Sequence, residues 1–346
     1  MLKKTTLCIA ISSIIASTNL QAVTIFENAD GNNIEVYGEV GVGGHIGANN
    51  EYGEFFTDEK TYLDDSFATL GVKGKLDKTY YRLELDYERE NWEYGSGDMV
   101  LSIDKVFLGY KFLPNHAIEF GLTDTALDDY DKFGDFTFDT TVETGEAGDQ
   151  ANTLKYEGSI SNIRMGLSYS YKGESSSGSA LGDVINGYVG YFSDYVDVVV
   201  WAETRTGSEG ESKYGQQVLY AAGLRAYVTD KLALGFNAYI ENEDIAQSSS
   251  YNDYETLQNK GGLISARYKY TPKIEFTGSL NYEAFEEWDI NSEYGVSPDD
   301  EYSWGKERTW STVGINFKPM RSVVYALEIN FGESAQDAYA YGRVYF

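Results

Sequence analysis

The feature that most constrains this chain is an alternation of apolar with small or polar side chains at every second residue. In the segment 163–171, apolar or aromatic residues hold the odd positions and small or polar residues hold the even ones. The same pattern occurs in 218–226, 232–241 and 323–331. Because successive side chains of a β-strand point to opposite faces, each segment has one apolar face and one polar face. We therefore predict an all-β fold.

The connections between these segments alternate in length. Short turns such as Asp77-Lys78 and Pro272-Lys273 are followed by long connections rich in Gly, Ser, Asp and Glu, such as 123–148 and 286–305. We predict sixteen strands that begin near Ile34, Ser66, Thr79, Met99, His116, Gln150, Asn162, Val184, Tyr195, Gln216, Leu232, Lys260, Ile274, Arg308, Val323 and Ala338. An even number of strands of about ten residues, with turns at one end and loops at the other, is typical of an antiparallel transmembrane β-barrel.

A soluble β-sandwich also alternates, but its apolar face is a core of Val, Ile, Leu and Phe. Here the apolar faces carry many of the 30 tyrosines, close to the predicted strand ends, as in the aromatic girdle of a membrane protein. In a bilayer an open sheet edge would leave backbone groups without hydrogen bonds, so the sheet must close. A closed barrel is the preferred interpretation.

The first residues have the pattern of a secretory signal peptide. Lys3 and Lys4 precede an apolar run from Leu7 to Ala16, and Leu20-Gln21-Ala22 offers a small residue for cleavage. The run is too short to span a bilayer, which needs about 20 apolar residues. We predict a signal peptide over residues 1–22 and one barrel domain over 23–346.

Composition excludes several classes of function. The chain has a net charge of -28, which is unsuited to binding the phosphates of nucleic acids. It contains two histidines and one cysteine, Cys8, which lies inside the predicted signal peptide. A disulfide framework or a thiolate metal cluster is therefore not expected, and we expect no metal site and no cofactor. Acidic loop segments at 128–129, 209–211 and 299–301 lack the spacing of a calcium-binding loop.

The last strand is the most specific single feature. Val344 and the terminal Phe346 lie on one face of 341–346, and Tyr341, Arg343 and Tyr345 lie on the other. This aromatic end resembles the segment by which the barrel-assembly machinery of Gram-negative bacteria selects its clients. Phe346 is thus the predicted assembly signal.

Several short segments, in order, resemble the general diffusion porins of the Gram-negative outer membrane, a family of sixteen-stranded trimeric barrels. They are Val36-Tyr37-Gly38, 107–112, 118–121, 122–129 and 152–156. The resemblance covers the whole mature chain. It implies a homotrimer surrounded by outer-membrane lipid and lipopolysaccharide, a third loop folded inward to narrow each channel, and passive transport of small hydrophilic solutes without catalysis.

In this family the inward loop carries carboxylates, and the facing wall carries basic residues. The chain keeps the loop pattern, and its candidate constriction residues are Asp124, Asp128, Asp129, Asp131, Lys132 and Asp135. Phe133, Phe136 and Phe138 are available to pack the loop against the wall. The alternative is that these acids are ordinary solvated loop charges.

The predicted wall departs from the family. By strand parity Glu39, Thr69, Asp104 and Asp149 face the lumen, and three of these four bring an acid where the family has a base. The other candidate wall residues are Arg82, which partly compensates the lumen-side acids Glu84, Asp86 and Glu88 of the same strand, and the later Arg225, Arg267 and Arg343. An acidic lining concentrates cations, so we predict a cation-selective channel. Lys105 has outward parity, which indicates either a contact in the trimer or a local bulge.

Other functions stay open at this point. A sugar- or oligosaccharide-selective porin would need an aromatic track in the lumen, and seven residues have suitable parity: Tyr37, Trp201, Tyr227, Tyr239, Tyr339, Tyr341 and Tyr345. The long loops are also compatible with a surface adhesin or receptor. An enzyme is not expected, because neither His45 nor His116 lies in a hydrolase pattern.

Overall fold

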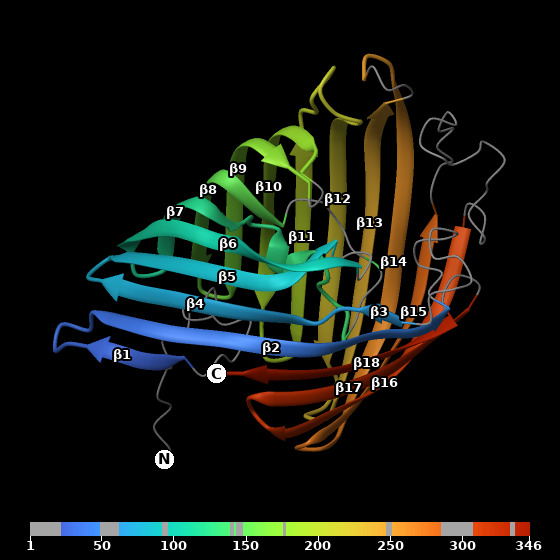
Figure 1. Ribbon diagram of the computed structural model, residues 1–346. Coiled ribbons are helices and arrows are strands. Elements are labelled where there is room, and N and C mark those ends of the chain that lie inside the picture. Colours follow the sequence, from blue (N-terminus) through green and yellow to red (C-terminus); the bar gives the residue numbers. More distant parts are fainter. Residues whose placement is uncertain are drawn as a thin grey trace.

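The computed structural model describes residues 22–48, 62–91, 96–138, 142, 148–175, 178–246, 251–284, 307–332 and 336–346. These residues form eighteen strands and one short 3-10 helix (Figure 1). The strands are β1 (Val23–Glu27), β2 (Asn33–Ala48), β3 (Tyr62–Asp64), β4 (Phe67–Leu76), β5 (Thr79–Asn91), β6 (Ser96–Leu113), β7 (His116–Asp124), β8 (Asp149–Ile160), β9 (Ile163–Glu174), β10 (Ala180–Phe192), β11 (Val196–Arg205), β12 (Tyr214–Tyr227), β13 (Leu232–Ala246), β14 (Tyr254–Thr271), β15 (Ile274–Ala284), β16 (Glu307–Met320), β17 (Val323–Gly332) and β18 (Gln336–Tyr345). The helix is η3 (Asp128–Tyr130). No helix among the described residues is long and apolar enough to cross a membrane.

Sixteen of these strands close into an antiparallel barrel. From β4 to β18 each strand pairs with the next one along the chain, β18 pairs with β2, and β2 pairs with β4. The short strands β1 and β3 add to β2 without changing this count. Closure pairs the last strand, β18, with the first barrel strand, β2, so neither is left as an edge with unpaired backbone groups. The predicted sixteen-stranded barrel is confirmed.

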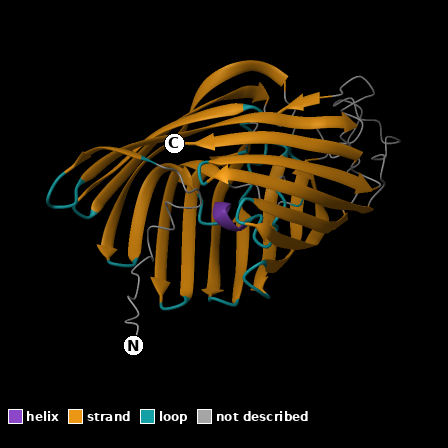
Figure 2. Cartoon of the chain, turned by 90° about the horizontal axis from the view of Figure 1, so that it is seen from below, coloured by secondary structure: helices purple, strands orange, loops and turns teal. Residues whose placement is uncertain are grey.

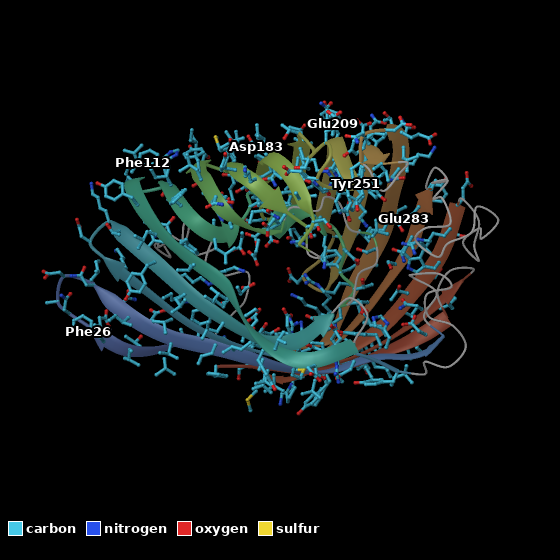
Figure 3. The ribbon with its side chains drawn as sticks, turned by 45° about the horizontal axis from the view of Figure 1, so that its top comes forward. Phe26, Phe112, Asp183, Glu209, Tyr251 and Glu283 are labelled. Atoms are coloured by element: carbon cyan, nitrogen blue, oxygen red, sulfur yellow. The ribbon has the colours of Figure 1, made fainter. Side chains whose placement is uncertain are left out.

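The wall has an apolar outside and a polar inside. On β17, for example, Leu327 is 44% exposed, whereas Glu328 is fully buried toward the interior. Figure 3 shows side chains projecting from both faces of the wall. An outer face of exposed Val, Leu, Ile, Phe and Tyr is costly in water and suits hydrocarbon.

Fourteen of the sixteen strands begin within three residues of the predicted positions. The exceptions are β10 and β14, which begin four and six residues before the predicted Val184 and Lys260. Residues 254–259 are mostly polar, so they show no alternation, yet their backbone continues the ladder with β13 up to the pair Tyr254 and Ala246. Polar strand extensions of this kind are invisible to a hydrophobicity pattern.

The two ends of the barrel chain meet on one side of β2. Strand β1 pairs with residues 33–36 of β2, and the terminal Phe346 exchanges two backbone hydrogen bonds of 2.9 Å with Gly38. The Phe346 ring fills the space beside Gly38 that a Cβ would occupy. Strand β1 was not predicted, because its five exposed residues carry no alternation.

The predicted signal peptide stays a prediction, since residues 1–21 lie outside the described part of the chain.

Candidate functional site: the channel constriction

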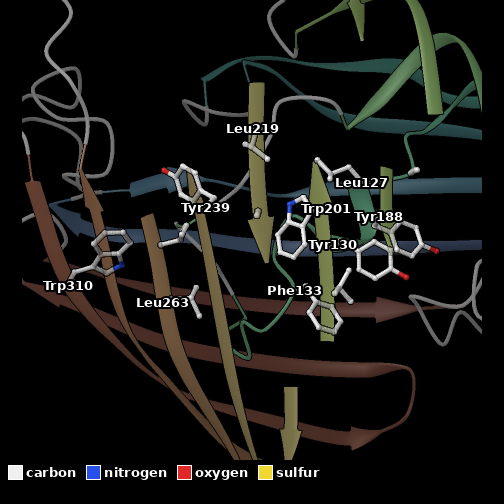
Figure 4. Close-up of a cluster of buried hydrophobic side chains, with 13 residues drawn as sticks. Leu127, Tyr130, Phe133, Tyr188, Trp201, Leu219, Tyr239, Leu263 and Trp310 are labelled. Carbon is white, nitrogen blue, oxygen red and sulfur yellow. The ribbon is translucent and has the colours of Figure 1, made fainter. Parts of the chain in front are cut away.

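The connection between β7 and β8 folds into the barrel. We call residues 125–148 the inward loop; the structure describes 125–138, 142 and 148. Figure 2 shows its helix η3 inside the ring of strands. Loop residues Ala126, Leu127, Tyr130, Phe133 and Val142 are buried in one cluster with the wall residues Tyr188, Val199, Trp201, Leu219, Ala221, Tyr239, Leu263 and Trp310 (Figure 4). The predicted inward-folded third loop is therefore confirmed, and burial of this apolar cluster holds it in place.

Polar contacts to the loop backbone fix its path along the wall. The Asn237 side chain donates to the Asp131 carbonyl at 3.0 Å, and the Ser265 hydroxyl donates to the Gly134 carbonyl at 2.6 Å. The contact is so close that a Cβ on Gly235 of β13 would overlap the Gly134 carbonyl oxygen. Gly134 itself has a φ of +100°, which favours glycine. Further along, the Phe138 N–H donates to the buried Glu328 carboxylate at 2.6 Å.

The predicted wall arginines of the later strands stack on aromatic rings. The guanidinium carbon of Arg225 lies 4.1 Å from the Phe133 ring centroid, and that of Arg267 lies 4.7 Å from the Phe136 centroid. These distances are those of cation–π contacts, so both arginines help to hold the loop. Arg225 also lines a second cavity of about 970 Å³ at the turn end of β9 to β12, together with Arg164 and Tyr227.

The opposite part of the lumen is strongly acidic. We call it the acidic cavity; it has a volume of about 430 Å³. Ten carboxylates line it, namely Glu39, Asp65, Glu84, Asp86, Glu88, Asp104, Asp124, Asp128, Asp129 and Asp149. Four cationic side chains line it, namely Lys73, Arg82, Lys105 and Arg343. Carboxylates thus outnumber cationic groups by six.

Most of the predicted constriction and wall residues meet in this cavity. Its lining includes Glu39, Thr69, Arg82, Asp104, Asp124, Asp128, Asp129, Asp149 and Arg343. Asp124 belongs to the end of strand β7 and not to the loop. Arg82 contacts the Tyr37 hydroxyl and forms an ion pair of 2.7 Å with Glu84.

Three predicted loop residues are absent from the lining of the acidic cavity. Asp135 accepts two local hydrogen bonds of 2.8 Å, from the N–H and hydroxyl of Thr137, and so shapes the loop. Asp131 contributes the backbone carbonyl that Asn237 binds. Lys132 is exposed. The sequence alone did not separate the loop acids that face the acidic cavity from those that shape the turn.

Lys105 lies at the centre of a carboxylate cluster. Its ammonium nitrogen is 2.7 Å from Asp124, 2.9 Å from Asp104, 3.0 Å from Asp149 and 3.9 Å from Glu84. The outward orientation derived from strand parity is wrong. The register shifts between Glu84 and Leu85, which pair with Lys105 and Ile103, so that Asp104 is the extra residue of a β-bulge. The bulge turns both Asp104 and Lys105 inward.

Asp128 lies in η3, outside the strands, beside this cluster. Burial and the neighbouring Asp124 charge raise the pKa of the Asp128 carboxyl to about 7. The Asp129 charge also contributes to raising the Asp128 pKa, whereas the Lys105 and Lys155 charges lower it. The charge of the acidic cavity therefore changes near neutral pH.

The aromatic residues of the sugar-porin alternative do not form an open track. Trp201 and Tyr239 pack beneath the inward loop. Tyr339 and Tyr341 stack on each other with ring centroids 5.4 Å apart and pack with Phe138. Tyr37 is 1% exposed and donates to Glu84. Five of the seven candidate aromatics are thus buried.

Both histidines contact other side chains. His45 contacts the Asp337 carboxylate, and His116 contacts the Tyr156 hydroxyl. Across the described ranges, no group of three or more His, Cys, Asp or Glu residues is arranged to hold a metal ion. The acidic segment 299–301 lies outside those ranges.

Comparisons by sequence found no matching protein-family model and no matching curated protein. Comparison with solved structures found extensive likeness. OmpF of Salmonella typhi, solved in complex with daunomycin, has 13% identity and a TM-score of 0.66, covering 94% of this chain and 100% of that one. The chain has the porin fold. The outer membrane channel DcaP of Acinetobacter baumannii has 12% identity, a TM-score of 0.65 and coverage of 93% and 99%. The trimer form of OmpT, an outer membrane protein of Vibrio cholerae, has 14% identity, a TM-score of 0.63 and coverage of 91% and 99%.

Proposed function

We propose that this chain is an outer-membrane porin of a Gram-negative bacterium and forms a passive, cation-selective channel for small hydrophilic solutes and ions. The apolar outer face of the barrel supports a membrane location, and two of the structural neighbours described above, DcaP and OmpT, are described as outer-membrane proteins. Residues 1–22 would direct export and then be removed, and Phe346 at the end of β18 would be the signal for the assembly machinery. The proposed assembly is a homotrimer in lipid and lipopolysaccharide, as one neighbour is described in trimer form.

The observation that carries cation selectivity is the lining of the acidic cavity. Its ten carboxylates exceed its four cationic groups, and the surrounding protein and lipid have a low dielectric constant, which focuses the field. Arg225 and Arg267, two of the other predicted wall cations, are absent from this lining and contact the phenylalanines of the inward loop. An excess of carboxylates in a narrow passage attracts cations and repels anions.

The test is uptake of matched solutes into liposomes that contain the purified protein. Glucosamine, N-acetylglucosamine and glucuronate share a pyranose ring and differ in charge. We expect swelling in the order cation, neutral, anion, because the acidic cavity must be crossed by each solute. Uptake of glucuronate as fast as that of glucosamine would contradict cation selectivity, and no uptake of any of the three would contradict an open channel.

A sugar-selective channel is the runner-up, and a surface receptor is the next alternative. The burial of five candidate aromatics counts against the first. Saturation of swelling by a neutral sugar at low concentration would favour it over a general channel.

A further inference from the structure

Two arginines of the inner wall lie on either side of strand β13. Arg225 of β12 pairs with Gly235, and Arg267 of β14 pairs with Ala233, two residues further along the same strand. The Nε atom of each arginine is buried and has no hydrogen-bond partner among the described residues. Two positive charges thus stand on neighbouring parts of the wall with only small side chains on the strand between them.

The inward loop fills the space between these arginines. The Gly134 carbonyl lies against Gly235, and Phe136 follows two residues later. The Phe136 ring centroid is 4.7 Å from the guanidinium carbon of Arg267 and 5.8 Å from that of Arg225. One ring therefore contacts both cations, and because the loop lies on the inner surface of the wall, this ring separates them from the passage.

We propose that Phe136 is a specificity-determining residue: its ring covers Arg267 and one side of Arg225, and so denies passing anions a contact with these two cations. The proposal rests on the cation-selective channel proposed above and deepens it. It gives the inward loop a second role besides narrowing the passage, because the loop also removes anion-binding positions from the wall.

The chemistry of the guanidinium group explains why a cover matters. An arginine that is open to a passage presents up to five N–H donors in a fixed fork, which suits carboxylates and other anions. A phenyl ring over the guanidinium blocks approach from that side, and the negative face of its π system partly offsets the positive charge. An anion would have to displace the ring before it could reach Arg267.

Arg82, on the opposite part of the wall, is neutralised in another way. Its guanidinium forms an ion pair of 2.7 Å with Glu84 and lines the acidic cavity. A carboxylate partner on the acidic side and a phenyl ring on the loop side have the same effect, since both make an arginine less attractive to an anion.

The experiment measures the potassium-to-chloride permeability ratio from reversal potentials in planar bilayers. Four proteins are compared: wild type, Phe136→Ala, Arg267→Gln and the double variant. We expect Phe136→Ala to lower the ratio by about threefold or more, because an uncovered cation in a narrow passage concentrates anions. In the Arg267→Gln background the same substitution should change the ratio little. Phe136→Tyr keeps the ring and should retain the wild-type ratio.

Leu127→Ala is the matched control for a loosened loop. Leu127 belongs to the same loop, is 2% exposed and packs in the buried cluster, so its truncation weakens packing without removing a ring from either arginine. Its ratio should stay near that of wild type. A fall as large as that of Phe136→Ala would overturn the proposal. An unchanged ratio in Phe136→Ala would overturn it too, and so would an equal fall with and without Arg267.

Folding is followed by the heat-dependent migration of the barrel on gels. If Phe136→Ala does not fold, Phe136→Leu removes the aromatic face with a smaller loss of volume. We expect it to lower the ratio in the same direction, with Arg267→Gln abolishing the effect, and a wild-type ratio would contradict the cover. Wild-type channels without cation selectivity would instead contradict the proposed function. The comparison with and without Arg267 measures the cover whatever the wild-type ratio is, which separates the two failures.

Discussion

At the scale of single residues, strand parity predicted side-chain orientation well where the ladder is regular and failed where it is not. Glu39, Thr69 and Arg82 line the cavity, since β2, β4 and β5 pair without a shift along this stretch. Lys105 did not follow, because the bulge at Asp104 inserts one residue. A bulge reverses the orientation of the residues that follow it, and it leaves no hydrophobic signature in the sequence.

The pH dependence of selectivity belongs to this scale. Asp128 has a raised pKa of about 7, so it is mostly ionised at pH 8 and mostly neutral at pH 6. We predict that the potassium-to-chloride permeability ratio falls as the pH drops from 8 to 6, because the acidic cavity loses negative charge. Asp128→Asn should lower the ratio at pH 8 by up to about twofold and make its pH dependence less steep.

The control for this prediction is Asp135→Asn. Asp135 belongs to the same loop, but it binds Thr137 and is absent from the lining of the cavity. Its replacement should leave both the ratio and its pH dependence unchanged. A pH profile in Asp128→Asn as steep as that of wild type would show that Asp128 is not a titrating group of the passage.

At the scale of elements, the inward loop is the part of the site that the sequence described least. The inward fold of the loop was predicted from family resemblance, and its phenylalanines were identified as available for packing. The wall residues that contact the loop could not be predicted from local sequence patterns. Those partners, such as Asn237, Ser265 and Glu328, lie 106, 131 and 190 residues away from the loop groups that they bind. Contacts so distant in sequence depend on closure of the whole barrel.

Gly235→Ala tests how the loop is held. The added Cβ would overlap the Gly134 carbonyl oxygen, so the loop must move away from β13. We expect a loss of about 1–3 kcal/mol in stability, as for other overpacked contacts, and larger fluctuations of the open-channel current. Single-channel recording and thermal unfolding measure the two effects.

Gly342→Ala is the matched substitution on β18, where the nearest atom to a new Cβ is the Tyr325 ring at 3.3 Å. It should give quiet channels with little loss of stability, because an exposed side chain can shift. Equally quiet channels in Gly235→Ala would show that the loop does not depend on close packing against β13.

At the scale of the whole molecule, the alternation and the connection lengths were sufficient to predict the barrel. Both follow from physics that acts along the entire chain: a bilayer requires a closed sheet with an apolar outside, and a meander puts turns and loops at opposite ends. Sequence patterns missed the short β1 and the polar extension of β14, which depend on backbone pairing alone. They also did not predict that Arg225 and Arg267 contact the inward loop. Strand parity indicates which face of the sheet a side chain lies on, but it does not indicate which residue the side chain contacts there.

The central claim is that the charge of the acidic cavity governs what passes through the channel. The most direct measurement is the reversal potential of the purified protein in a planar bilayer under a KCl gradient. An excess of six carboxylates over cationic groups predicts a potential of the sign and size of a cation-selective channel, with conductance steps in threes for a homotrimer. A potential near zero, or one of the sign of chloride selectivity, would contradict the account.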